Sequence, residues 1–517
     1  MNRNSKKLLL GIDIGTTGCK CTLYDLSGVH VATAYQEYKM HHFQSGWVEE
    51  DPQDWWDSCV NNIKKLWEQP GIQPQNVASI GVSCTNSIIP IGKNNKVLYN
   101  AIMQIDQRAI SQVEMLKETI GEKKIFEITG NRVAPGTFSL PTMLWLKQNN
   151  PEVFKNTHKF LVPGGLIVWY LTGKYTIDTS RMATTLLGNI KDCTWDEELA
   201  EMAGIPVSKL PDIHQSWEVV GEVTKEAAAI TGLIPGTPVV AGAMDTVAAA
   251  VGSSAIDPGT SFLTIGTCAR LCITVDSVEK LDNRFLNCPS VYPNRWLSIA
   301  VSNSAGASMR WLRDNLSSEE IRKELMAGES GYKALDDEII SSIPGSNGVL
   351  YLPYLSGERA PIWDPYARGV LFGLSLGTEH KDIARSMMEG TGFALKQTME
   401  IWKQSGATPE KISISGGGAK SRIWPKIIAD IIGQRIYRLD INETETFGAA
   451  LLAGMGVGLI KDPTQVASNV ISNDEYIEPC EANVEIYSKM FELYNSVYEN
   501  LKNDFYRLEQ ISSLRSK

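Results

Sequence analysis

The chain carries one short pattern twice, about half its length apart. Residues 8–20 read LLLGIDIGTTGCK and residues 261–272 read SFLTIGTCARLC, so each copy has an apolar run, then Ile-Gly-Thr, then a basic residue. Self-similarity of this kind indicates a repeated structural unit, here a strand, a tight turn and a second strand. The repeat therefore predicts two related halves, each beginning with a hairpin.

Each turn also has the groups that bind phosphate. Gly15 and Gly266 permit tight turns in which backbone N–H groups crowd together, and the threonine hydroxyls add further donors. A single turn of this kind is explained equally well by a phosphate site and by an ordinary β-hairpin. The repetition, with the acidic Asp13 in the first copy only, favours a nucleotide held between two related domains.

Composition limits the classes of protein to consider. A chain of 517 residues exceeds the roughly 250–300 at which single cores stop growing, so two domains are expected. With 43% hydrophobic and 21% charged residues, and no apolar run near the ~20 residues of a membrane span, we expect a globular protein without a membrane partner. The net charge of −10 argues against a nucleic-acid partner and favours a small molecule. The basic start runs straight into LLLGID without a secretory signal, which predicts a cytoplasmic location.

Cysteine and histidine spacing predicts no metal centre. The nine cysteines include no Cys-x-x-Cys pair, so we expect them to be reduced and mostly buried. His41 and His42 fall in a polar, loop-like stretch without companion ligands at zinc spacing.

Strands and helices alternate along the chain, as in an α/β protein. The turn-rich AIDPG at 255–259 precedes the second hairpin, which predicts domains at 1–254 and 255–517. Residues 476–517 have helical periodicity typical of a closing helix. The expected strands are within 8–35 and at 77–83, 261–275, 295–301 and 411–414, and the expected helices are 54–67, 111–119, 305–316 and 421–432.

Two further segments suggest chemistry. Residues 412–421 (ISISGGGAKS) form a glycine-rich strand-to-helix turn, which lets a flat or anionic ligand approach the backbone but is also found as a packing turn. Asp245 lies where an apolar strand meets an Ala-rich helix, in VVAGAMDTVAAAVG. It is either a helix N-cap or the carboxylate that accepts a proton from an attacking hydroxyl in phosphoryl transfer.

Taken in order, the motifs resemble those of the FGGY family of carbohydrate kinases, over residues 8–456, and among these the xylulokinases in particular. The resemblance implies two actin-like, ribonuclease H-like domains around a deep cleft, with ATP and Mg²⁺ as cofactors and an open-chain sugar as substrate. It leaves the oligomeric state open, a homodimer included. The motifs are GIDIGTTG (11–18), GWVEEDPQDWW (46–56), Asp245, IGT (265–267), YLPYLSGERAP (351–361), RGVLFG (368–373) and GGGAKS (416–421).

The resemblance also implies roles for individual residues. Asp13 would hold the magnesium through water, and Asp245 would be the catalytic base. The nucleotide would be bound by Gly15, Thr16, Thr17, Lys20, Gly266, Thr267, Gly417, Gly418 and Ala419. The sugar would be bound by Trp47, Thr85, Asn86, Ser87, Asp106, Asp245 and Thr246.

Departures from the xylulokinase pattern fall on the sugar side. Residues 85–88 are TNSI where Gln-Met-His-Gly is usual, Thr246 replaces an asparagine, and Thr142 replaces a lysine, whereas GERAPIWD at 357–364 resembles gluconate kinases. A site that hydrogen-bonds particular hydroxyls discriminates strongly, so these changes affect the identity of the sugar more than the reaction. We therefore expect a kinase for a pentulose such as D-xylulose, with a gluconate, polyol or other keto-sugar kinase as the alternative. The rival from another class is an actin-like nucleotide switch without sugar chemistry.

Overall fold

The computed structural model describes residues 7–439, 441, 443–471 and 475–513. The chain divides into two compact units. Unit 1 comprises residues 1–258, 274–298 and 443–471, and unit 2 comprises residues 259–273, 299–442 and 472–517. Because two later segments return to unit 1, this division is not a linear one, and the domain boundary at 254/255 stays a prediction.

The central sheet of unit 1 is built on the first hairpin. β1 (Leu8–Ile14) pairs antiparallel with β2 (Gly18–Asp25) and parallel with β6 (Val77–Cys84). The strand order is β14-β15-β6-β1-β2-β3, with the short β16 also on β6. The remaining strands of this sheet are β3 (His30–Glu37), β14 (Val219–Glu222), β15 (Pro238–Val240) and β16 (Ala243–Met244).

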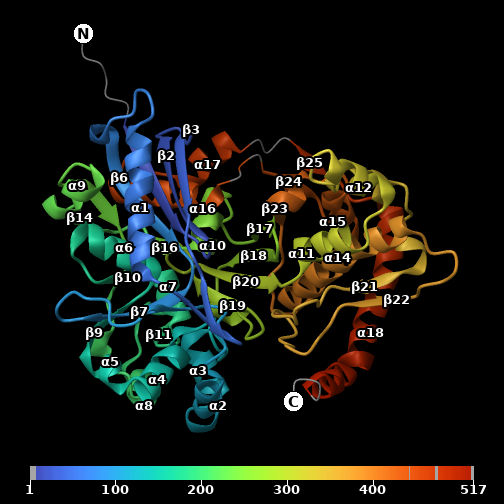
Figure 1. Ribbon diagram of the computed structural model, residues 1–517, viewed down its shortest axis with the longest axis horizontal. Coiled ribbons are helices and arrows are strands. Elements are labelled where there is room, and N and C mark those ends of the chain that lie inside the picture. Colours follow the sequence, from blue (N-terminus) through green and yellow to red (C-terminus); the bar gives the residue numbers. More distant parts are fainter. Residues whose placement is uncertain (1–6, 440, 442, 472–474, 514–517) are drawn as a thin grey trace. The chain divides into compact units, whose positions relative to one another are not determined.

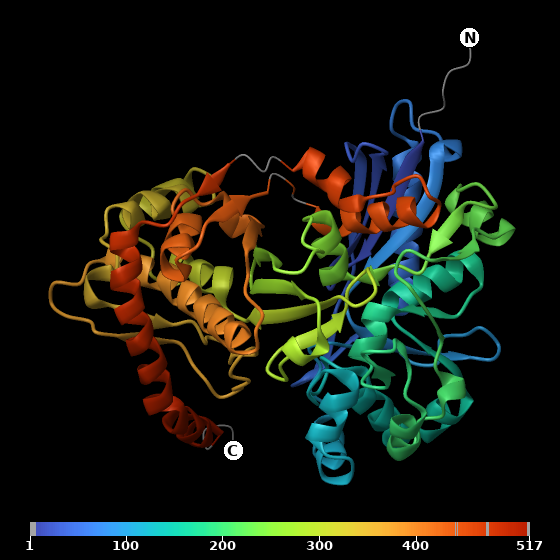
Figure 2. The same cartoon turned by 180° about the vertical axis from the view of Figure 1, so that it is seen from behind.

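Helices cover both faces of this sheet (Figures 1 and 2). α1 (Pro52–Trp67) lies along β2 and β3, while α16 (Thr444–Gly456) lies along β1 and β6 and packs on α10 (Asp245–Gly252). Glycine in the strands allows this close approach, because a Cβ at Gly11 would lie 1.9 Å from the carbonyl oxygen of Thr446, and one at Gly81 would lie 2.0 Å from that of Ala449. A larger residue at either position would force α16 away from the sheet.

Unit 1 also contains a second sheet, of order β4-β5-β8-β7-β9. Its strands are β4 (His41–Gln44), β5 (Trp47–Glu50), β7 (Ser87–Gly92), β8 (Ala101–Met103) and β9 (Thr157–Leu161). Shorter strands are β10 (Thr176–Asp178), β11 (Gly188–Asn189), β12 (Thr194–Trp195), β13 (Asp212–His214) and β19 (Leu286–Pro289). The helices are α2 (Ile110–Thr119), α3 (Glu122–Thr129), α4 (Ser139–Asn149), α5 (Pro151–Asn156), α6 (Pro163–Thr172), α7 (Thr179–Thr184), α8 (Glu197–Ala203), α9 (Lys225–Thr231) and α17 (Pro463–Val470), with 3₁₀ turns η1 (Pro74–Asn76), η2 (Val207–Lys209) and η3 (Val278–Lys280).

Unit 2 repeats the arrangement of the first hairpin. β17 (Thr260–Ile265) pairs antiparallel with β18 (Ala269–Val275) and parallel with β23 (Lys411–Ser415), as β1 pairs with β2 and β6. This confirms that the two halves share a structural unit. The other strands are β20 (Trp296–Ser302), β21 (Leu350–Leu352), β22 (Val370–Phe372), β24 (Ile436–Arg438) and β25 (Tyr476–Ile477). The helices are α11 (Ala305–Asn315), α12 (Glu319–Met326), α13 (Tyr332–Ile340), α14 (His380–Gln404), α15 (Trp424–Ile432) and α18 (Glu481–Ser513), with 3₁₀ turns η4 (Ser346–Gly348) and η5 (Gly417–Lys420).

The closing helix α18 is confirmed, and it packs on unit 2 through aromatic side chains (red in Figure 1). Tyr494 is fully buried, and its hydroxyl lies 2.6 Å from that of Tyr354. The hydroxyl of Tyr487 donates a hydrogen bond of 2.7 Å to Glu389 of α14. These contacts make α18 part of the core of the unit.

Two details of the sequence analysis are wrong. His41 and His42 lie in strand β4, not in a loop, because residues 41–44 pair with β5 at one edge of the second sheet. The helix after the glycine-rich turn begins at Trp424 rather than at residue 421, since the chain first forms the 3₁₀ turn η5.

Six of the nine cysteines are buried, as expected. Among the described residues, no helix combines the length and the apolar character needed to cross a membrane.

Candidate active site

The first hairpin forms a tight turn in unit 1. The N–H of Gly15 donates to the carbonyl oxygen of Gly18 at 3.1 Å, and the hydroxyl of Tyr38 donates to the carbonyl oxygen of Gly15. Thr17 is exposed, and the hydroxyl of Thr16 lies 3.3 Å from that of Thr85. Lys20 forms an ion pair with Glu443 of the same unit, which partly neutralises the lysine charge.

Asp13, at the end of β1, lies in an acidic environment. Burial raises the pKa of its carboxyl well above the ordinary value, and the carboxylates of Glu445 and Asp245 raise it further, against the hydrogen bond donated by Ser83 at 2.7 Å. Carboxylate oxygens are the ligands that a hard divalent cation prefers, and such a cation would offset the burial of Asp13 beside other acids. The Asp13 carboxyl therefore suits a magnesium ion held through water.

Parallel strands bring Asp13 and Asp245 to the same edge of the sheet. Asp13 is opposite Ser83 in the β1–β6 register, and Met244 of β16 is opposite Cys84 of β6. Asp245 follows Met244 directly as the first residue of α10. The carboxyl ends of parallel strands are where α/β sheets bind ligands, so this edge is the candidate catalytic edge of unit 1.

The side chains of α7 hold the base candidate in place. The guanidinium of Arg181, which is 2% exposed, lies 3.5 Å from the Asp245 carboxylate and also donates to the carbonyl oxygen of Cys84. The N-cap Asp178 accepts hydrogen bonds from Ser180 and from the backbone of Arg181. The hydroxyl of Ser180 in turn accepts a bond of 2.9 Å from the N–H of Met244. Sequence reasoning missed this support, although Asp178 before a helix was a readable capping signal.

The residues nominated as sugar contacts after β6 are largely engaged in the protein itself. The amide of Asn86 donates to the carbonyl oxygen of Thr137 at 2.8 Å, and Ser87 donates to the carbonyl oxygen of Ile102 at 2.9 Å. Thr246 donates from its hydroxyl to the Asp245 carboxylate at 3.1 Å. Thr85 is also buried.

A buried charge cluster contains Trp47 and Asp106. Arg108 lies 4.0 Å from the centre of the Trp47 ring and donates to both oxygens of Asp106 and, at 2.6 Å, to Glu49. Asp106 also accepts a bond of 2.6 Å from the N–H of Val48. These bonds support a positioning role for Asp106, and its direct contact with a sugar stays a prediction. The stacking on Arg108 was not foreseen.

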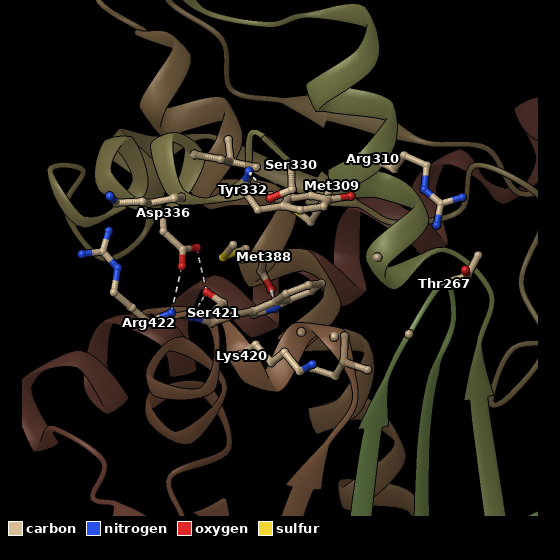
Figure 3. A pocket seen from close by; sticks show the side chains of 18 residues that line it. Thr267, Met309, Arg310, Ser330, Tyr332, Asp336, Met388, Lys420, Ser421 and Arg422 are labelled. Carbon is tan, nitrogen blue, oxygen red and sulfur yellow. Dashed lines mark hydrogen bonds between the residues drawn. The ribbon is translucent and has the colours of Figure 1, made fainter. Parts of the chain in front are cut away.

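Unit 2 contains a pocket of about 810 Å³, within the usual range for small-molecule sites (Figure 3). Gly266, Thr267, Gly417 and Gly418 line it, whereas Ala419 is not among its lining residues and is buried beside it. Sequence reasoning missed most of its wall, because the lining side chains come from segments far apart in the sequence. The additional apolar and aromatic residues are Ile265, Met309, Tyr332, Leu335, Met388 and Trp424, and the charged ones are Arg310, Lys333, Asp336, Lys420 and Arg422.

Both glycine-bearing turns at this pocket are fixed by hydrogen bonds. Asp336 accepts from the hydroxyl of Ser421 at 2.7 Å and from the N–H of Arg422 at 2.8 Å, as Figure 3 shows. At the second hairpin, the N–H of Gly306 donates to the carbonyl oxygen of Gly266 at 3.0 Å. Four cations against one carboxylate around an apolar pocket suit a flat, anionic ligand such as a nucleotide.

The geometry can be compared with known proteins. The N-terminal domain of the FGGY family of carbohydrate kinases matches residues 8–252, and its C-terminal domain matches residues 255–457. The chain belongs to this family. It is therefore a sugar kinase, a phosphotransferase that uses ATP, with two domains of actin-like fold, and the rival interpretation as a switch without sugar chemistry is set aside.

Individual relatives within the family differ in their named substrates. The xylulose kinase of Bacillus subtilis (strain 168) is 30% identical over 503 residues, which cover 96% of this chain and 98% of that protein. A crystal structure of a gluconate kinase from Lactobacillus acidophilus has a TM-score of 0.89 and 28% identity, covering 97% of this chain and 99% of the other. The ligand-bound xylulose kinase from the same organism gives the same TM-score and identity, with 97% and 100% covered.

Proposed function

We propose that this FGGY kinase transfers the γ-phosphoryl group of ATP, with Mg²⁺, to a hydroxyl of an open-chain pentulose such as D-xylulose. The observation that carries the proposal is the meeting of Asp13, Thr85 and Asp245 at the carboxyl ends of β1, β6 and β16 in unit 1. Phosphoryl transfer needs a carboxylate that orients the attacking hydroxyl, and a metal ion that neutralises the charge of the phosphates. This edge supplies one carboxylate for the hydroxyl and another that can hold the metal ion.

Asp245 is the proposed base. Its carboxylate takes the proton of the attacking hydroxyl, and Arg181 at 3.5 Å holds that carboxylate in place. Asp13 is the residue proposed to hold magnesium. Bound magnesium would neutralise charge on the phosphates during transfer. The N–H groups and hydroxyls of Thr16 and Thr17 are proposed to bind the terminal phosphates, as is Lys20 of β2, while Gly15 closes the turn that presents them.

The pocket of unit 2 is proposed to bind the nucleoside part of ATP. Tyr332 and Trp424 offer aromatic surface to a purine, and Gly417 leaves the backbone of η5 open to it. Gly266, Thr267, Gly418 and Ala419 keep their proposed nucleotide roles, with Ala419 acting through the packing of the turn.

The pentulose assignment rests on full-length similarity to xylulose kinases. Gluconate is the second candidate, because the gluconate kinase structure is equally similar in fold and identity. Trp47, Thr85, Asn86, Ser87, Asp106 and Thr246 stay the proposed sugar-side residues.

The test is a coupled assay of ADP release with the full chain against a panel of ketoses, polyols and aldonic acids. We expect the highest kcat/KM with a ketopentose, and no turnover after removal of divalent cations by a chelator. Each tenfold preference corresponds to about 1.4 kcal/mol of differential transition-state binding. A tenfold preference for gluconate would replace the pentulose proposal, and turnover of no member of the panel would contradict the sugar class.

A further inference from the structure

Three buried thiols in unit 1 take no part in the kinase chemistry described above. Cys19 and Cys21 lie in β2, and Cys59 lies in α1. All three are 0% exposed. Their sulfur atoms lie within 4.8 Å of one another, and the Cys19 and Cys21 sulfurs are 4.0 Å apart.

The local fold explains why these thiols meet. Residues two apart on a strand point to the same face of the sheet, so Cys19 and Cys21 both face α1. Cys59 and Asn62 are three residues apart on α1 and lie on its buried side. A Cys-x-Cys strand and a Cys-x-x-Asn helix therefore face each other in the core. Cys59 is 38 positions after Cys21, a spacing that no short metal-binding motif covers.

The spacing of the sulfurs fits a three-coordinate ion. With metal–sulfur bonds of about 2.3 Å in a trigonal plane, neighbouring sulfurs are about 4.0 Å apart. The Cys19–Cys21 separation has this value, and the other two pairs, at no more than 4.8 Å, need movements of less than 1 Å. Thiolate ligands select soft ions such as Cu⁺ over hard ones.

Asn62 of α1 is hydrogen-bonded beside this group. Its amide donates to the carbonyl oxygen of Cys19 at 2.9 Å, which ties α1 to the strand that carries two of the three thiols.

We propose that Cys19, Cys21 and Cys59 form a buried site for one thiophilic d¹⁰ cation, Cu⁺, bound by three sulfur atoms. Loading breaks three S–H bonds, releases three protons to solvent, forms three copper–sulfur bonds to β2 and α1, and stabilises unit 1. Three sulfur ligands suit the monovalent Cu⁺, whereas a structural Zn²⁺ is almost always held by four ligands.

The experiment uses the full reduced chain under anaerobic conditions. Exposed thiols such as Cys480 are first alkylated with iodoacetamide in the native state, and Cu⁺ is then titrated against bicinchoninate as a competing ligand. We expect one retained Cu⁺ per chain, a raised thermal midpoint, and an X-ray absorption spectrum with three sulfurs at about 2.3 Å. Cys59→Ser should weaken retention at least tenfold and leave two sulfurs. Cys288→Ser, at an equally buried cysteine of the same unit, should behave as the unsubstituted chain.

Three results would overturn the proposal. One is loss of all Cu⁺ to bicinchoninate, and another is equal retention by Cys59→Ser and Cys288→Ser. The third is retention of Zn²⁺ in preference to Cu⁺, which contradicts the monovalent assignment. If Cys59→Ser does not fold, the sulfur count in the spectrum of the unsubstituted chain decides, since fewer than three sulfurs excludes the site.

Discussion

A methyl group added at Gly417 and one added at Gly418 meet different surroundings, although both glycines line the pocket of unit 2. A Cβ at Gly417 would meet only the carbonyl oxygen of Ile265, at 4.0 Å. A Cβ at Gly418 would lie 2.4 Å from Cγ2 of Ile265 and 3.1 Å from the Trp424 ring. Substitution at Gly417 should therefore leave folding intact and fill the pocket, whereas substitution at Gly418 should disturb packing.

The magnitudes follow from these contacts. Gly418→Ala forces Ile265 or Trp424 to move, and overpacking of this kind costs about 1–3 kcal/mol. For a unit of this size, each kcal/mol lowers the melting midpoint by about 2–4 °C. Gly417→Val adds three carbons where the nucleoside is proposed to lie, so we expect ATP to bind at least tenfold more weakly, or about 1.4 kcal/mol.

Calorimetry with a nonhydrolysable ATP analogue and thermal unfolding of each variant test both expectations. Gly417→Ala is the matched control for the added methyl group and should unfold at the midpoint of the unsubstituted chain. Unchanged nucleotide affinity in a folded Gly417→Val variant would refute the pocket assignment. An unchanged midpoint in Gly418→Ala would refute the packing argument.

Three other changes test the catalytic edge and the core of unit 1. Asp245→Asn should lower kcat in the coupled assay by about 10²–10⁴ with ATP affinity in calorimetry nearly unchanged, and near-normal turnover would contradict its role as base. Arg181→Met should lower kcat in the coupled assay at least tenfold with ATP affinity nearly unchanged, because the guanidinium that holds the Asp245 carboxylate at 3.5 Å is lost, while Arg181→Lys should restore part of the rate; unchanged kcat in Arg181→Met would contradict this positioning role. Burial raises the pKa of Glu50 from 4.5 to about 8. The folded chain therefore binds more protons than the unfolded chain in this window, and its free energy of unfolding falls as pH rises through it. Glu50→Gln should be more stable than the unsubstituted chain at pH 9 by up to a few kcal/mol in urea denaturation but not at pH 4, and equal stability at pH 9 would contradict the raised pKa.

The sequence predicts the hairpins and the position of Asp245 well, because these features are local. An apolar run followed by Ile-Gly-Thr indicates both a strand and the turn after it. Because the pattern occurs at residues 8–20 and again at 261–272, each occurrence strengthens the prediction of a hairpin at the other. The Ala-rich run after Asp245 likewise predicts α10 from its first residue. Periodicity over residues 476–517 is long enough to predict α18.

The pocket wall and the thiol group could not be predicted in this way. Tyr332 and Trp424 are contributed by α13 and α15, and no spacing in the sequence relates them. Polar strand residues were also misread, since the His41–Gln44 stretch looks like a loop until its pairing with β5 is known. Contacts between residues far apart in the sequence therefore determine the pocket wall, the thiol group and strand β4, which local composition does not predict.

Hydrogen-bond capacity, more than residue type, limits what the proposed sugar-side residues can offer a substrate. The Asn86 amide has two donors, one of which reaches Thr137, and its oxygen lies 3.3 Å from the hydroxyl of Thr184. One N–H of the Asn86 amide is thus left for its proposed contact with the sugar. The Thr246 hydroxyl already donates to Asp245, so toward a substrate it can act only as an acceptor without breaking that bond. An exchange of one polar residue for another in the sequence therefore changes both the number and the direction of the available hydrogen bonds. For this reason the motifs identify the family of the enzyme but not its sugar.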